Sequence, residues 1–78
     1  MNKIENEQLI KNIMLQVCDA LSENGYNPII QITRYILSDD PTYITSKNNA
    51  RNLICKIDRD QILRILVKEY LMDENECR

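Results

Sequence analysis

The chain has no histidine, no tryptophan, no phenylalanine and a single glycine among its 78 residues. Without histidine it lacks the commonest general base and the Ser-His and Cys-His nucleophile pairs. One glycine is too few for a phosphate-binding loop or a dinucleotide-binding turn, which need several for close backbone approach. Asp58 and Asp60 are two residues apart, so on a helix they point in different directions, and helix capping explains them better than catalysis. We therefore expect a protein that is not an enzyme and uses no cofactor.

Cysteine is scarce and irregularly placed. The three cysteines are odd in number and far apart, and none forms a C-x-x-C pair (Cys18, Cys55 and Cys77). This spacing argues against disulfides and fits reduced thiols in the cytosol. We expect Cys18 and Cys55, which fall on apolar stripes, to be buried inert thiols. No metal site is expected, because the acidic cluster near the C-terminus lacks the glycine turn of a calcium loop (Asp73, Glu74 and Glu76).

Long apolar runs are also missing. No stretch approaches the roughly 20 apolar residues of a membrane-spanning helix. Residues 1–7 are polar and acidic, unlike a secretory signal, and the net charge of −2 gives no global attraction to nucleic acid or anionic lipid. We expect one cytoplasmic domain over residues 1–78, with 1–7 as a flexible N-terminal arm and 73–78 as a frayed C-terminal tail.

Apolar residues at helical spacing are abundant. From about residue 5 to 23 they recur at i, i+3, i+4 and i+7, which predicts a helix with one buried side: Leu9, Ile10, Ile13, Met14, Val17, Cys18 and Leu21. Gly25 is expected to end this helix in the left-handed conformation, with Tyr26 folding back onto it.

Asn27 and Pro28 fit the N-cap and first position of a second helix, which should run to about Ser38. Its expected buried side is Ile29, Ile32, Ile36 and Leu37. The sequence Asp39-Asp40-Pro41 then ends it. Residues 42–45 form a short linker, in which Tyr43 and Ile44 are expected to reach into the core.

A third helix is predicted over about residues 46–57, with an apolar side of Ala50, Leu53, Ile54 and Ile57. A fourth should run from Arg59 to about Met72, because Asp58 and Gln61 have the spacing of a capping box, bracketed by Ile57 and Ile62. Its expected buried side is Ile62, Leu63, Leu66, Val67, Tyr70 and Leu71. The expected fold class is all-α, a compact bundle of about four helices.

The first and last helices carry wider apolar arcs than one contact needs. Leu9 and Leu15 lie beside the first stripe, and Ile65 and Met72 lie beside the last. Wide burial inside a monomer and a homodimer interface explain this pattern equally well.

Positive charge is concentrated in the segment 47–68, where six basic residues face two acidic ones: Lys47, Arg51, Lys56, Arg59, Arg64 and Lys68 against Asp58 and Asp60. Two helices joined by a tight turn could imitate a helix-turn-helix, so a small DNA-binding protein is the alternative function. The missing glycine in the turn and the acidic whole chain argue against it.

Three hydroxyls in or beside the linker are accessible candidates for phosphorylation, which adds nearly two negative charges: Thr42, Thr45 and Ser46. The stronger explanation for Thr45 and Ser46 is that one of them caps the third helix.

One resemblance covers roughly residues 9–72. The run Gly25-Tyr26-Asn27-Pro28-Ile29 and the residues after it are similar to the IreB family of small regulatory phosphoproteins of Gram-positive bacteria: Gln31, Ile32, Tyr35, Leu37, Ser38, Asp40, Pro41, Tyr43 and Ile44, then Ala50-Arg51-Asn52, Ile54, Lys56, Arg59-Asp60 and Ile62. The resemblance implies a helical homodimer without enzymatic activity. It also implies action downstream of a transmembrane Ser/Thr kinase and its cognate phosphatase, in cell-envelope homeostasis and intrinsic cephalosporin resistance.

The sequence departs from this family at the N-terminus. The family's phosphorylated threonines lie in the arm before the first helix, but residues 1–8 contain neither serine nor threonine. No phosphorylation site is therefore carried over. Arg34 and Asp39 stand where the family commonly has glycine, and an aspartate can still adopt a left-handed turn.

The expected protein-contact surface is the linker with its polar neighbours, because short loops present side chains on a rigid scaffold. Its candidate residues lie near the joints between helices: Asp40, Pro41, Tyr43, Arg51, Arg59 and Asp60.

Overall fold

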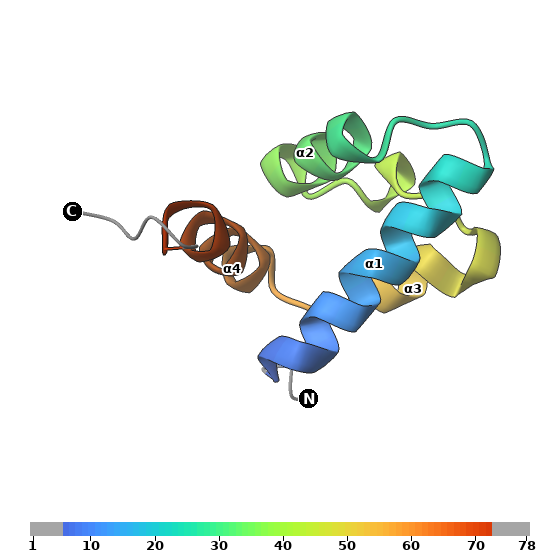
Figure 1. Cartoon of the computed structure of the whole chain (residues 1–78). Coiled ribbons are helices and arrows are strands. Elements are labelled where there is room, and N and C mark those ends of the chain that lie inside the picture. The colour runs from blue at the N-terminus through green and yellow to red at the C-terminus, as the bar shows by residue number, and fades with distance from the viewer. Residues whose placement is uncertain (1–5, 73–78) are drawn as a thin grey trace.

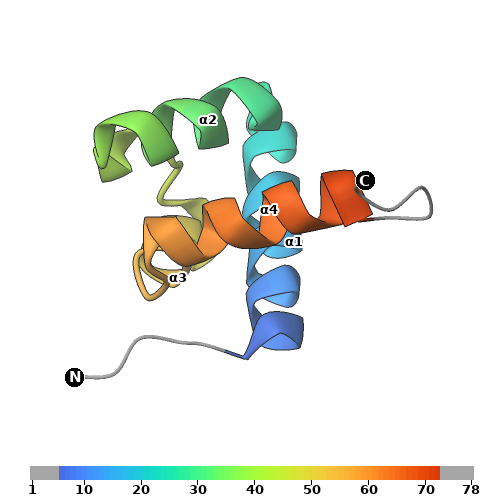
Figure 2. The ribbon, with the colours of Figure 1, turned by 90° about the vertical axis from the view of Figure 1, so that its left-hand side faces the viewer.

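Every regular element of this computed structural model, which describes residues 6–72, is helical. Four α-helices and two short 3₁₀ turns follow one another: α1 (Glu7–Glu23), α2 (Pro28–Ser38), η1 (Pro41–Tyr43), η2 (Lys47–Asn49), α3 (Ala50–Ile54) and α4 (Arg59–Met72). Both α2 and α4 cross α1 and do not run along it (Figure 1, Figure 2). The predicted all-α class with four helices is confirmed, in an arrangement of crossing helices.

The ends of α1 are set by local hydrogen bonds. Asn6 caps its start, since the side-chain oxygen accepts from the Leu9 N–H at 3.0 Å. Two residues assigned to the flexible arm, Asn6 and Glu7, therefore belong to the helix start, and residues 1–5 lie outside the described part. At the other end Gly25 has φ of +84°, and the Tyr26 N–H donates to the Leu21 carbonyl at 2.9 Å. The glycine stop is confirmed.

The predicted bounds of α2 are also confirmed. The Asn27 side chain accepts from the Ile30 N–H at 3.1 Å, and Pro28 occupies the first turn. Asp39 adopts the left-handed conformation with φ of +59° and donates its N–H to the Tyr35 carbonyl at 2.8 Å. The prediction that Asp39 can adopt a left-handed turn is confirmed.

The third helix was predicted too long at both ends. It spans only Ala50–Ile54, because Asn48 and Asn49 before it have φ of 55° and 63°, which is left-handed. Short polar side chains tolerate this conformation, and no α-helix continues through it. Ser46 makes no side-chain capping bond, and Thr45 Oγ1 accepts from the Lys47 N–H at 3.2 Å. Neither hydroxyl therefore caps α3.

The core lies where α1 packs against α2 and α3. It consists of Ile10, Ile13, Val17, Ala20, Leu21, Tyr35, Ile44, Ala50, Ile54, Ile57 and Ile62. The predicted role of Ile44 as a buried linker residue is confirmed, with Tyr43 half-buried beside it. Of the predicted buried side of α2, Ile32 and Ile36 pack partly against the core. Ile29 and Leu37 are 77% and 79% exposed, and Tyr35, which was not predicted, is buried.

The two cysteines in the described part differ from prediction. Cys18 is half-buried and Cys55 is exposed, whereas both were expected to be buried. Cys55 is the first residue after α3, which ends at Ile54. Cys77 and the acidic cluster at residues 73–76, like the predicted frayed tail, lie outside the described residues.

Helix α4 has the predicted bounds and an unpredicted environment. Of its expected buried side only Ile62 is buried, while Ile65 packs partly against the core. The other five expected core residues are between 44% and 87% exposed: Leu63, Leu66, Val67, Tyr70 and Leu71. The prediction that this stripe is buried within the chain is therefore wrong.

Candidate functional site

The linker between α2 and α3 is a braced polar turn. The Asp40 carboxylate accepts hydrogen bonds from the Thr42 N–H at 3.0 Å and from Thr42 Oγ1 at 2.7 Å. These bonds, with a smaller contribution from the Arg51 guanidinium, hold the pKa of Asp40 below its usual value. Arg51 Nε donates to the Ile44 carbonyl at 2.9 Å, and Gln31 Nε2 donates to the Tyr43 carbonyl at 3.0 Å. The turn is held from both sides.

The start of α4 is fastened to the end of α2 by Arg59. Its Nη1 donates to the Ile36 carbonyl at 2.6 Å, and its Nε lies 3.1 Å from Asp39 Oδ1. We call these two contacts the Arg59 tether. Since the last four carbonyls of an α-helix lack intrahelical partners, the guanidinium satisfies one of them while neutralising the carboxylate.

The predicted contact residues therefore fall into two groups. Asp40, Pro41, Tyr43 and Arg51 lie together at the linker, while Arg59 belongs to the tether and Asp60 pairs with Arg64 Nε at 3.0 Å along α4. The adjacent residues Asp39 and Asp40 connect the groups. Both arginines brace the backbone of other elements, a role that the sequence did not indicate.

A shallow polar hollow of about 460 Å³ lies beside the tether. It is lined by Tyr35, Asp39, Cys55, Ile57, Asp58, Arg59 and Asp60. Burial, reinforced by the neighbouring Cys55 thiol to which the phenol is hydrogen-bonded, raises the pKa of Tyr35 to about 12. The phenol therefore keeps its proton at physiological pH.

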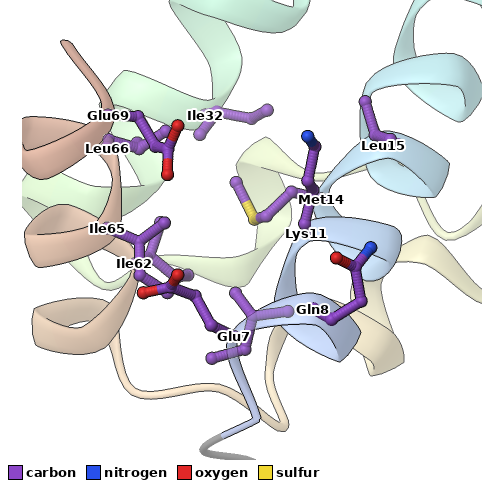
Figure 3. Close-up of a pocket in the computed structure, with 11 residues that line it drawn as sticks. Glu7, Gln8, Lys11, Met14, Leu15, Ile32, Ile62, Ile65, Leu66 and Glu69 are labelled. Carbon is purple, nitrogen blue, oxygen red and sulfur yellow. The ribbon is translucent and has the colours of Figure 1, made fainter. Parts of the chain in front are cut away.

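A larger, apolar groove opens between α1, α2 and α4 (Figure 3). Its volume is about 500 Å³, and its apolar walls are Ile10, Met14, Leu15, Ile32, Ile62, Ile65 and Leu66. Figure 3 shows Met14 reaching from α1 toward α4. Its rim is polar: Glu7, Gln8, Lys11 and Glu69. Sequence reasoning did not locate this groove, although the excess apolar residues of the first and last helices were its signal.

One ion pair joins α1 and α4 beside this groove. Lys68 Nζ lies 2.7 Å from Glu7 Oε2, and both side chains are half exposed. The hydrogen bond with Glu7 raises the pKa of Lys68. Because exposed ion pairs contribute little stability, α4 is held across the groove only weakly.

The basic residues of segment 47–68 are mostly engaged inside the chain. Arg51 bonds a carbonyl, and Arg59, Arg64 and Lys68 each pair with a carboxylate. A helix-turn-helix reading also needs a longer first helix than the five residues of α3. The arrangement thus gives the DNA-binding alternative no support.

The three candidate phosphorylation sites differ in their surroundings. Thr42 is exposed, but its hydroxyl donates to Asp40. Thr45 is half-buried and accepts from the Lys47 N–H, whereas Ser46 is exposed. All three stay predictions, with Ser46 the most open to an enzyme.

Two features are absent from the described residues, 6–72. No group of three histidine, cysteine, aspartate or glutamate side chains there is placed to hold a metal ion. No helix in that range has both the length and the apolarity to cross a membrane.

One comparison relates the chain to known proteins. The family model of the IreB regulatory phosphoprotein matches residues 1–72, which include all four helices, the linker and the groove. The match extends the resemblance seen in the sequence to the N-terminal residue. The chain therefore belongs to the family of IreB regulatory phosphoproteins.

Proposed function

We propose that this protein is a non-enzymatic cytoplasmic regulator that acts by contacting other proteins. Its upstream partners are a transmembrane Ser/Thr kinase and the cognate phosphatase, and its role lies in cell-envelope homeostasis and intrinsic cephalosporin resistance. The observation that carries the proposal is the family match over residues 1–72. The geometry supports it, because hydrogen bonds hold the backbone of the linker and so position its polar side chains for contact.

The contact surface proposed for the regulated partner is the linker group. Asp40, Pro41 and Tyr43 sit on a turn whose backbone is held by Gln31 and Arg51. A turn braced in this way loses little conformational entropy on binding. Because Arg51 is a brace, the cleaner test of this surface replaces Tyr43 alone, and we expect Tyr43→Ala to weaken capture of the partner while helix content is retained.

We propose that the modification falls on the linker, since residues 1–8 of this sequence contain no hydroxyl side chain. A phosphate on Thr42 would sit beside the Asp40 carboxylate and lose the bond that closes the turn. Ser46, which precedes Lys47 and makes no capping bond, avoids both costs. We therefore place the linker hydroxyls, and Ser46 first, as the sites of regulation.

The test is incubation with the cognate kinase and ATP, followed by intact-mass analysis and peptide mapping. The expected result is one added phosphate in the peptide that holds residues 42–46, removed by Ser46→Ala. A phosphate elsewhere would leave the kinase relationship standing and reject the linker. An unmodified mass, with a control substrate phosphorylated in parallel, would reject the kinase relationship itself.

The protein is also proposed to act as a homodimer. The structural support is the exposed apolar surface of α4, which the rest of the described chain does not cover. Sedimentation at micromolar concentration tests this directly, because the mass of one 9.2 kDa chain would contradict it.

A further inference from the structure

Asn24 and Gly25 form a chemically labile pair at the end of α1. The side-chain amide of an asparagine can be attacked by the backbone nitrogen of the next residue, and a following glycine has no side chain to hinder the approach. Gly25 is the single glycine of the chain, so no other asparagine is followed by one. Asn24 and Gly25 are both exposed, and a Cβ added to Gly25 would meet no atom within 4 Å, so the pair is open to water.

The fold engages both groups that this reaction needs. Asn24 Nδ2 donates to the Ala20 carbonyl at 2.7 Å, and the Gly25 N–H donates to the Ser22 carbonyl at 3.1 Å. Both acceptors are among the last four carbonyls of α1, which have no partner within the helix. The attacking nitrogen must give up its proton and turn toward the side chain, so both hydrogen bonds break first. The pair therefore reacts only when the end of α1 opens.

We infer that Asn24 is a site of spontaneous deamidation and that the hydrogen bonds at the end of α1 set its rate. The Gly25 nitrogen loses its proton to hydroxide and forms a bond to Cγ of Asn24, while the side-chain nitrogen takes a proton from water and leaves as ammonia. Water then opens the resulting cyclic imide at either of its carbonyl carbons. The products are aspartate, and isoaspartate, in which the main chain runs through the former side chain. Neither step needs an oxidant, a reductant or a cofactor.

The neighbouring asparagines are less reactive because of the residues that follow them. Asn27 precedes Pro28, whose backbone nitrogen has no proton to lose. Asn49 precedes Ala50, which carries a Cβ beside the attacking nitrogen and donates its N–H to the Lys47 carbonyl. These asparagines therefore serve as internal references for Asn24 in the same chain.

Deamidation weakens the junction between α1 and α2. It replaces the amide donor of Asn24 by a carboxylate, which cannot donate to the Ala20 carbonyl. The new negative charge also lies at the C-terminal end of a helix, where it is unfavourable. Ala20 and Leu21 are fully buried beside it, and the Tyr26 N–H donates to the Leu21 carbonyl. The reaction thus marks, irreversibly, the chains in which this junction has opened most often.

The test of the site is incubation of the full chain at mildly alkaline pH, with and without a denaturing concentration of urea. Peptide mapping that separates aspartate from isoaspartate then locates the products. In urea we expect them first at Asn24, and without urea we expect the reaction there to be about tenfold slower or more, because two hydrogen bonds must break before each attack. The matched control is Asn24→Gln, whose longer side chain forms the corresponding ring much more slowly, so products at position 24 should be absent.

Three results would overturn this assignment. They are equal rates at Asn24 with and without urea, an unchanged Asn24 in urea, and products at Asn49 that appear before those at Asn24. Each is read from the wild-type chain, so the outcome does not depend on whether a variant folds.

Two further variants test the effect on the junction. Asn24→Asp reproduces one product, and we expect its Tm to fall by roughly 4–8 °C, because a hydrogen bond is lost and a charge is added at the helix end. Asn24→Ala removes the donor without adding charge, so its Tm should fall by less. A Tm of Asn24→Asp equal to that of the wild type would overturn the proposed weakening of the junction.

Discussion

Helices α1 and α4 have the same spacing of apolar residues, but most of these residues are buried only in α1. In α1 the stripe buries Ile10, Ile13, Val17 and Leu21 almost completely, because α2 and α3 pack directly on it. In α4 a stripe of equal regularity buries only Ile62. The spacing of apolar residues therefore shows that a helix has a side to cover, but not that its own chain covers it.

The largest effect on the free energy of unfolding is expected in the half of the molecule where α1 packs against α2 and α3. Ile54 is fully buried among α1 residues, so Ile54→Ala should lower the free energy of unfolding by about 2–5 kcal/mol through lost transfer energy and a residual cavity. Chemical denaturation at a fixed protein concentration measures it. The contrast is Leu71→Ala in half-exposed α4, for which we expect less than about 1 kcal/mol in the monomer. Equal losses would remove the distinction between the halves.

The pH dependence of stability tests the same half of the molecule, through the ionisation of Tyr35. Its folded-state pKa of about 12 is above the ordinary value of 10.0. The stabilisation is therefore fully present below pH 10 and is lost as the pH rises toward 12. Thermal melts across this window should show a falling Tm for the wild type and a flatter profile for Tyr35→Phe, which has no proton to lose.

Removing the Arg59 tether tests how α4 is attached to the rest of the molecule. Arg59→Ala deletes the bonds to the Ile36 carbonyl and Asp39, at an expected cost of about 1–2 kcal/mol after allowance for partial exposure. The loss should appear as faster amide hydrogen exchange in α4, with α1 unchanged. Arg64→Ala is the matched control, because it removes only an exposed pair with Asp60.

The smallest effect is expected from the Lys68–Glu7 pair. Both side chains are half exposed, so Lys68→Glu should lower the Tm by roughly 2 °C or less at low salt and by nothing at high salt. Adding Glu7→Lys should restore the attraction with the charges exchanged. If the double variant is no more stable than Lys68→Glu, the two residues do not interact in solution.

The sequence allowed the linker group of the candidate site to be predicted, because Asp40, Pro41 and Tyr43 fall between two helices whose ends could be recognised. It did not reveal the bracing roles of Arg51 and Arg59, since each side chain bonds a backbone carbonyl of a preceding element, 7 and 23 residues away respectively. The groove was missed for the same reason: its walls come from three helices whose arrangement is not local.

Helix ends were determined by the sequence wherever the cap is a neighbouring side chain. Asn27 with Pro28, Asp39 and Gly25 mark the ends of α1 and α2, because their hydrogen bonds and φ angles involve residues at most five positions away. The exception is α3, which Asn48 and Asn49 shorten by adopting a left-handed conformation that asparagine permits without requiring.

Only the tertiary structure decided which apolar residues became core. Tyr35 is buried while Leu37 is exposed on the same helix, and Ile62 is buried while Leu66 is not. Hydrophobic burial is non-directional and depends on what packs against a side chain, whereas a cap depends on a hydrogen bond formed within a few residues. Local chemistry therefore specified the helices, and long-range packing specified the surface through which we propose that this regulator pairs.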